Sequence, residues 1–306
     1  MNLRQAQQRA TRVLVVTDAE IAPNPTNRRR FDAVLGGVGQ ALIATGVLML
    51  LFVAYQLWGT GLSEQRAQSD LKRTFSTQLP AVPTYGDPVT RISSEQIGLN
   101  KIVVAGVDYK ALQKGPGLFD GSPLPGQLGN VAIAGHRTSY GAPFSRLNEL
   151  GVGDSIVLTR GTSTYTYEVY KEPFVVDPSQ VEVVKTLDNT IAELTLVTCH
   201  PKWTSKNRLI VKAKLESSVT PQPATVYSPS VVNVAAVLDS GWFHDSSALP
   251  GAIILAIVLA LLVIVAKRFI ARGQRAQIVY PVTVLVFLPV LFVFFGYLTR
   301  LMPVNM

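Results

Sequence analysis

The chain has a single cysteine, Cys199, and an arginine, Arg208, stands nine residues after it. The runs AELTLVTC and NRLIVKAKL around them are apolar and β-branched, which predicts two strands joined by a loop. Cys199 then lies at the end of the first strand and Arg208 at the start of the second. Neighbouring strands can bring a thiol and a guanidinium into one pocket, where the positive charge favours the nucleophilic thiolate. The pattern therefore indicates cysteine chemistry.

An inert buried thiol is the alternative reading of Cys199. A free cysteine is among the most buried residue types and behaves as a small hydrophobic residue. The topology argued below places this thiol outside the cytoplasm, where an unpaired cysteine is open to oxidation. A thiol retained in such a compartment indicates a use.

Three histidines are available to transfer protons. His200 adjoins Cys199 at a strand end, where successive side chains point to opposite faces, so it is poorly placed to help the thiol. His244 stands at the foot of an apolar run near the C-terminus. By elimination His136, at the end of the predicted strand NVAIAGH, is the partner we expect, although a lone loop histidine is more often a surface residue.

Arg208 has a functional and a structural interpretation. It can stabilise the oxyanion that forms when a thiolate attacks a carbonyl, or it can be a solvated arginine at a strand end. The sequence contains no CxxC, HExxH or GxxxxGK[ST] motif, and no acidic cluster that favours calcium. We therefore expect no cofactor and no metal.

Three apolar runs account for a composition that is 48% hydrophobic. They cover residues 34–58, 249–266 and 278–298, and each is long enough, or nearly so, to cross a hydrocarbon core of about 30 Å. The first run is much longer than the roughly 7 to 15 apolar residues of a secretory signal, which favours an uncleaved anchor. The lipid bilayer is thus an expected partner.

Basic residues orient these runs. Six Lys or Arg precede the first run, and four lie between the second and third, where no acidic residue occurs. The positive-inside rule places both segments in the cytoplasm. Residues 59–248 carry 17 basic and 17 acidic residues, so the net charge of +8 reflects topology and does not predict nucleic-acid binding.

Short strands recur between the first and second apolar runs. They are expected within 89–108 (two strands and a turn), at 130–136, 155–160 and 163–176, and in the two runs around Cys199. Only APFSRLNEL, residues 142–150, shows a helical period. Many short strands with Gly and Pro between them predict a closed or nearly closed β-barrel.

The chain is thus expected to divide into nine segments. These are a cytoplasmic disordered leader (1–33), a transmembrane helix (34–58), an extracellular linker (59–88), the β-barrel (89–215), a second linker (216–248), a transmembrane helix (249–266), a cytoplasmic loop (267–277), a transmembrane helix (278–298) and an extracellular tail (299–306).

The segments LVTCHPKWTSKNR and GNVAIAGHRTSYGAPFSRLNEL together resemble the sortase family of Gram-positive bacteria. The resemblance covers about residues 89–215. It implies a mainly β fold, an eight-stranded sortase barrel with short helices, beside the transmembrane helices. It also implies that His136, Cys199 and Arg208 form a catalytic trio that needs no cofactor.

The run HRTSYGAPF is similar to class E sortases of actinobacteria, which are associated with LAxTG rather than LPxTG signals. Tyr140, four residues after His136, and Thr198 are expected to line the substrate pocket. The Asp-Pro-aromatic lid of pilin-polymerising sortases is missing from GPGLFDGSPLPG, yet anchors at both ends are more typical of that class. The choice between housekeeping and pilin assembly stays open.

The resemblance implies a transpeptidase. Cys199 is expected to attack the Thr–Gly carbonyl in the sorting signal of a surface protein or pilin, and His136 to protonate the leaving amine. A cell-wall precursor amine or a pilin lysine then accepts the acyl group. Two alternatives remain: a cysteine hydrolase or acyltransferase with the same trio, and a membrane-tethered barrel that binds without catalysis.

Overall fold

The computed structural model describes residues 25–77, 79–216, 219–224 and 246–302. The chain forms two compact units, Met1–Leu50 and Leu51–Met306, and each is treated by itself. Of the first unit, residues 25–50 are described, and all of them are helical. The second unit contains the β-sheet and all the elements that surround the candidate site.

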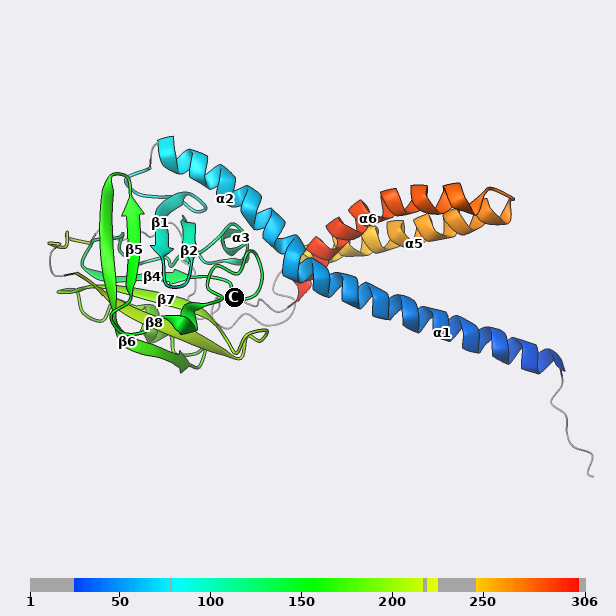
Figure 1. The fold of residues 1–306 in the computed structure, drawn as a ribbon, viewed down its shortest axis with the longest axis horizontal. Helices are drawn as coiled ribbons and strands as arrows, with labels where there is room; N and C mark the ends of the chain where they lie inside the picture. The colour runs from blue at the N-terminus through cyan, green and yellow to red at the C-terminus, as the bar shows by residue number, and fades with distance from the viewer. Residues whose placement is uncertain (1–24, 78, 217–218, 225–245, 303–306) are drawn as a thin grey trace, which may run out of the picture. The chain divides into compact units, whose positions relative to one another are not determined.

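Eight strands close into one barrel in the order β1-β2-β3-β4-β7-β8-β6-β5 (Figure 1). Their bounds are Pro88–Ser94 (β1), Leu99–Ala105 (β2), Gly117–Leu118 (β3), Gly129–Ala134 (β4), Ser155–Arg160 (β5), Ser163–Val176 (β6), Ala192–His200 (β7) and Asn207–Leu215 (β8). The expected mainly β, eight-stranded fold is confirmed. A closed barrel leaves no edge strand along which another chain could add.

Buried apolar side chains fill the interior of the barrel. Tyr167, Phe144 and Ile156 are among its largest fully buried residues. β4 is buried along its whole length, and it pairs in parallel with β7. Strands in parallel pairing are usually covered on both faces and read as continuous apolar runs, which is the character of this segment.

The prediction of a helix over residues 142–150 is wrong. Only a single 3-10 turn forms there, at Leu147–Glu149 (η3). Phe144, Leu147 and Leu150 are buried against the core with a spacing of three residues. A succession of tight turns places such residues on one face, as in a 3-10 helix, so the apolar spacing did not require an α-helix.

Other short elements, among them α3 and η4, were not expected from the sequence. Helix α3 (Tyr109–Leu112) begins at Asp108, whose carboxylate accepts a hydrogen bond of 2.8 Å from the Ala111 backbone N–H. Such N-capping supplies a partner for a backbone donor that the helix leaves unsatisfied. A 3-10 turn, η4, covers Val181–Val184 between β6 and β7.

Helix continues beyond the first apolar run at both ends. α1 covers Pro25–Ala54, and a π-helical turn, η2 (Tyr55–Gly59), joins it to α2 (Thr60–Thr77). Helix therefore begins inside the segment expected as a disordered leader. It also occupies most of the segment 59–88 that was expected as a linker.

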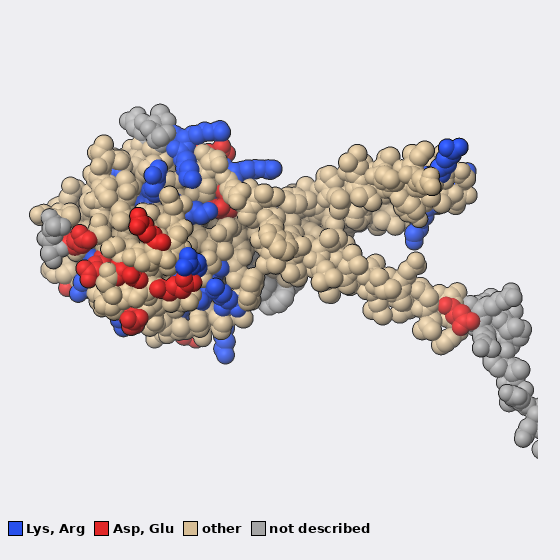
Figure 2. Space-filling model, viewed as in Figure 1, with Lys and Arg blue, Asp and Glu red and all other residues tan. Residues whose placement is uncertain are grey.

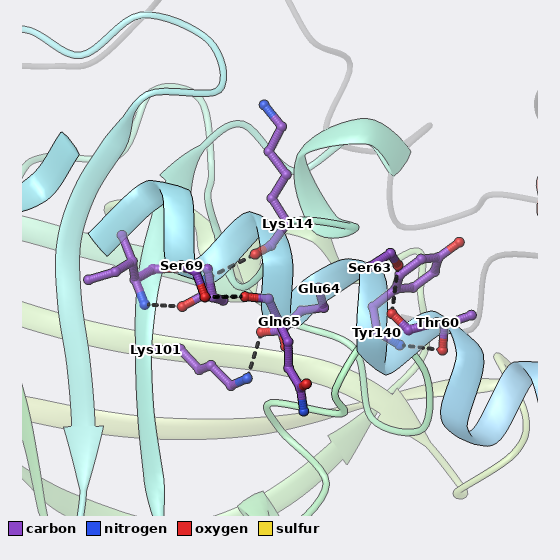
Figure 3. A network of polar contacts seen from close by, with 10 residues as sticks. Thr60, Ser63, Glu64, Gln65, Ser69, Lys101, Lys114 and Tyr140 are labelled. Atoms are coloured by element: carbon purple, nitrogen blue, oxygen red, sulfur yellow. Dashed lines mark hydrogen bonds and ion pairs between the residues drawn. The ribbon is translucent and has the colours of Figure 1, made fainter. Parts of the chain in front are cut away.

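Helix α2 is fixed to the barrel through one face. Glu64, Gln68, Leu71 and Phe75 recur at the spacing that places residues on one side of a helix. Glu64 forms an ion pair of 2.6 Å with Lys101 (Figure 3). The side-chain nitrogen of Gln68 donates to the Ile102 carbonyl, and its oxygen accepts from the Ile102 N–H. Leu71 packs with buried residues of β2, and Phe75 packs against the same cluster.

The two C-terminal apolar runs form an antiparallel helical hairpin. α5 covers Leu249–Ala271 and α6 covers Ala276–Leu301, so both helices are longer than the runs of the sequence. Among the described residues, these helices and the N-terminal one are long and apolar enough to cross a membrane. Figure 2 shows the hairpin without charged side chains along its length and with basic side chains near its turn.

Aromatic side chains join the hairpin to the end of α1. Phe52 packs edge-on against Phe295 of α6, with ring centroids 5.2 Å apart. Tyr55 does the same with Phe292 at 4.9 Å. These contacts lie inside the second unit, so the segment at 51–59 connects the barrel, through α2, to α6.

Replacing Gln68 with alanine should destabilise the protein by about 1–3 kcal/mol, because buried backbone groups would lose their partners. The Gln68 amide donates to the carbonyls of Ile102 (2.9 Å) and Lys114 (2.8 Å) and accepts from the Ile102 N–H (2.8 Å). Unfolding of the full chain in detergent measures the effect. Gln65→Ala, an exposed position on the same helix, is the control, and equal losses at both positions would contradict this account.

Candidate active site

The parallel pairing of β4 with β7 sets His136 beside the strand that carries the cysteine. The register runs from Gly129 opposite Ala192 to Ala134 opposite Val197. It continues one residue further, because the Gly135 N–H donates to the Val197 carbonyl at 3.0 Å. Residues in a parallel pair advance in the same direction, so His136 follows β4 at the level where β7 reaches Cys199.

Thr198 holds the backbone before His136 against β7. Its side chain is buried, and its hydroxyl donates a hydrogen bond of 2.7 Å to the Gly135 carbonyl. Gly135 itself has no room for a side chain, since a Cβ there would lie 2.7 Å from the Phe144 ring. The backbone before His136 is therefore held by a polar contact on one side and by the core on the other.

Cys199 and Arg208 are direct cross-strand partners in the antiparallel pair of β7 with β8. Both are 2% exposed. Arg208 Nη1 donates to the carbonyls of Ser205 (2.9 Å) and Asn207 (3.1 Å), which holds the guanidinium close to the turn between the two strands. The three residues expected to act together, His136, Cys199 and Arg208, thus meet at one end of the barrel.

A cavity of about 590 Å³ opens at this end. His136 and Tyr140 line it from the loop after β4. The remaining lining comes from Thr138 and Ser139 in that loop, Tyr109, the β7–β8 turn (Trp203, Thr204, Ser205, Lys206), the segment before α2 (Phe52, Gln56) and the end of α6 (Thr299, Met302). Thr198, Cys199 and Arg208 are buried, and they are not among the described residues that line the cavity.

Tyr140 packs against the imidazole. Its ring centroid lies 5.0 Å from that of His136, and the residue is 5% exposed. Its hydroxyl is 2.9 Å from the Tyr109 hydroxyl and accepts from the Gln113 side chain at 3.1 Å. Burial raises the pKa of Tyr140, and the neighbouring Tyr109 raises it further, so this hydroxyl stays protonated. Tyr140 therefore presents a neutral, fixed ring to the cavity.

The loop that carries Tyr140 has an unusual backbone. Tyr140 and Ala142 adopt positive φ angles of 48° and 44°. The left-handed region is unfavourable for residues other than Gly, Asn and Asp, so the surrounding contacts must impose this backbone conformation. One such contact is the hydrogen bond of 3.0 Å from the Tyr140 N–H to the Thr60 hydroxyl of α2 (Figure 3).

Sequence reasoning missed Arg137. Its guanidinium is buried, and Nη1 donates to the Cys199 carbonyl at 3.0 Å while Nη2 donates to Asn148 Oδ1 at 2.9 Å. The same Nη1 lies 2.9 Å from His200 Nδ1. The only available signal was its position next to His136, and a lone arginine gives no reason to expect burial.

His200 serves as an acceptor for Arg137. A guanidinium can only donate, so His200 Nδ1 accepts and Nε2 carries the hydrogen. Burial and the Arg137 charge both lower the pKa of His200, which keeps the ring neutral. His244, the third histidine, lies outside the described residues. Across the described ranges, no three His, Cys, Asp or Glu side chains gather as a metal site requires.

Comparisons with known proteins agree on one family. Residues 92–216 match the family described as "Sortase domain". The chain is 31% identical over 198 residues to Sortase SrtE1 of Streptomyces coelicolor, which covers 58% of this chain and 56% of the relative. It is 34% identical over 119 residues to Sortase D of Bacillus subtilis, covering 39% and 58%. The chain thus spans only a little more than half the length of these relatives.

Solved structures include the sortase E of Streptomyces avermitilis. It is 38% identical, with a TM-score of 0.40, and the match covers 44% of this chain and 91% of that one. A Clostridium perfringens sortase D5 is 31% identical, with a TM-score of 0.45 and coverage of 51% and 99%.

Proposed function

We propose that this chain, which carries a sortase domain in residues 92–216 and belongs to the sortase family, is a membrane-anchored cysteine transpeptidase. Its substrates would be surface proteins or pilins with an LPxTG-like or LAxTG-like signal, cleaved at the Thr–Gly bond. The observation that carries the proposal is the strand register. It sets the loop with His136 beside the only cysteine of the chain and places Arg208 directly across from that cysteine.

The first half of the reaction forms a thioester. The Cys199 thiolate attacks the Thr carbonyl carbon, and Arg208 stabilises the resulting oxyanion. The C–N bond to Gly then breaks, and His136 donates a proton to the leaving amine.

The second half transfers the acyl group. An amine from a cell-wall precursor or a pilin lysine enters the site, and His136 takes up a proton from it as it attacks the thioester. The thiolate leaves and is free for another cycle. Arg137, whose guanidinium touches the Cys199 carbonyl, adds positive charge that favours the thiolate.

Cys199→Ala should abolish both transpeptidation and trapping of a thioacyl intermediate while the fold persists. His136→Ala should be nearly as severe, because it removes the group that transfers protons. His200→Ala should be mild, since that ring is neutral and bonded to Arg137. To measure these effects, the full chain is incubated with LPxTG or LAxTG peptides and an amine, and the products are identified by mass.

Several results would contradict this assignment. Turnover by Cys199→Ala would remove the transpeptidase proposal, and a reversed order of the two histidine variants would make His200 the proton-transfer residue. A product released with water in place of the amine would indicate a hydrolase. A Cys199 thiol that no reagent labels in intact cells, together with absent turnover, would indicate a binding barrel.

Tyr140 is proposed to shape the pocket for the signal residue that is Ala in LAxTG and Pro in LPxTG. Its ring lies against His136 and lines the cavity. Tyr140→Ala should change the ratio of kcat/KM for the two peptides, because the ring is lost, whereas Tyr140→Phe keeps the ring and should change the ratio less. An unchanged ratio with lower stability in both variants would assign Tyr140 to packing alone.

The protein is further proposed to cross the membrane three times with the barrel outside. The basic turn between α5 and α6 supports a cytoplasmic position for that end of the hairpin. In a Cys199→Ala background, the thiol of Gln274→Cys should be shielded from an impermeant reagent on intact cells, and that of Ser246→Cys, at an exposed position, should be labelled. Labelling at Gln274 would mean that α5 does not span.

A further inference from the structure

The π-helical turn η2 places a side-chain amide of the membrane helix at the catalytic cavity. π-turns are rare, and they occur frequently at functional sites because the inserted residue changes which side chains face a neighbour. Gln56 lies in this turn and lines the same cavity as His136. The amide thus reaches the site from a helix that the sequence pattern assigns to the membrane.

Gln56 Oε1 is buried and has no hydrogen-bond partner among the residues that the structure describes. A buried carbonyl oxygen left without a donor is unfavourable, and natural proteins rarely keep one without a reason. The backbone carbonyl of Gln56 is satisfied, because the Thr60 hydroxyl donates to it at 2.8 Å. The unsatisfied acceptor is therefore the side chain, at a position where a ligand can enter.

The wall that carries Gln56 is fixed on both sides. On one side, Phe52 and Tyr55 pack edge-on against aromatic rings of α6. On the other, the Thr60 hydroxyl accepts from the Tyr140 N–H at 3.0 Å, which ties the turn to the loop that follows β4. These contacts fix the backbone that carries the Gln56 amide, which lines the same cavity as His136 and Tyr140. A group that contacts substrate needs such a fixed position.

The chemistry of the lining favours an uncharged polypeptide segment. No Asp or Glu lines the cavity within the described part of the chain, and Lys206 is positively charged. The described lining therefore offers no carboxylate to a charged ligand. The Phe52 and Met302 side chains on the same wall offer apolar contacts. An amide oxygen can accept a hydrogen bond from a backbone N–H, which is the donor that an uncharged peptide carries.

We propose that Gln56 is a substrate-binding residue whose Oε1 accepts a hydrogen bond from a backbone N–H of the donor polypeptide. The inference rests on the proposed transpeptidase function and extends it. The donor is then bound between the barrel, η2 and the end of α6, so these helical segments contribute to donor recognition.

The test uses the full chain in lipid nanodiscs with a donor peptide and an amine. Gln56→Met keeps the size of the side chain and removes the acceptor, and it should raise the KM for the donor about three- to tenfold, the effect of one hydrogen bond. The KM for the amine should not change. Gln65→Met, at an exposed position of α2 nine residues further along the chain, is the matched control and should leave both constants unchanged.

A binding measurement separates recognition from chemistry. In a Cys199→Ala background, Gln56→Met should weaken the affinity for a fluorescent donor peptide by the same factor. Gln56→Glu retains an acceptor oxygen and should bind more tightly than Gln56→Met. The thermal unfolding midpoints of all variants check that the fold persists, and the comparison of Glu with Met applies even if one variant is less stable.

The outcomes distinguish this inference from the proposed function. If the unsubstituted chain forms no thioacyl intermediate with any donor, the transpeptidase function fails. If it does, and Gln56→Met matches Gln65→Met in donor KM and affinity, the inference alone is overturned. A higher KM for the amine with an unchanged donor KM would also overturn it, since Gln56 would then contact the acceptor.

Discussion

The parallel pairing of β4 with β7 is the constraint on which the rest of the site depends. Two parallel neighbours end at the same edge of the sheet, so the residue after β4 and the last residues of β7 lie side by side although β5 and β6 come between them in the chain. The hydrogen bonds from Gly135 to Val197 and from Thr198 to Gly135 extend that pairing beyond the regular ladder. A shift of this register by one residue would move the side chain of Thr198 to the face that Cys199 now occupies, and that of Cys199 to the other face, because strand side chains alternate. The position of His136 relative to the thiol is therefore a property of the sheet and not of a flexible loop.

Helix α2 is the second support of the site. Thr60, Glu64 and Gln68 of α2 each make a buried polar contact with the barrel, and Thr60 contacts the backbone of Tyr140 itself (Figure 3). Gly141 lies so close to Glu64 that a Cβ would be 2.5 Å from its carboxylate oxygen. The loop between His136 and Ala142 is thus confined between the core and α2. Helix α2 therefore contacts both the barrel and the loop that lines the cavity.

Sequence patterns predicted what depends on local periodicity. The strands at 155–160 and 163–176 have the expected bounds, and the two strands around Cys199 and Arg208 form the expected neighbours. The helical period at 142–150 misled because a spacing of three residues suits tight turns as well as helices. Arg137 and Gln56 could not be predicted, because one is recognised by its burial against Cys199 and the other by a π-turn that exists only where the helix meets α6 and the barrel. Residues of that kind are defined by tertiary contacts.

Arg137 is a buried cation beside Cys199 at this end of the barrel. Removing a guanidinium from water is costly, and an acidic partner commonly offsets that cost. Arg137 instead donates to the Cys199 carbonyl, to Asn148 Oδ1 and to the neutral His200 ring, none of which carries a negative charge. Desolvation accordingly lowers the pKa of Arg137, while the charge of the Cys199 thiolate acts in the opposite direction and raises it. The positive potential is therefore left uncancelled by these three acceptors. By linkage, the same interaction favours the ionised thiol over the neutral one. A structural cysteine gains nothing from such a neighbour, whereas a nucleophile gains its reactive form, so the energetic cost of burying Arg137 is explained by the chemistry proposed for Cys199.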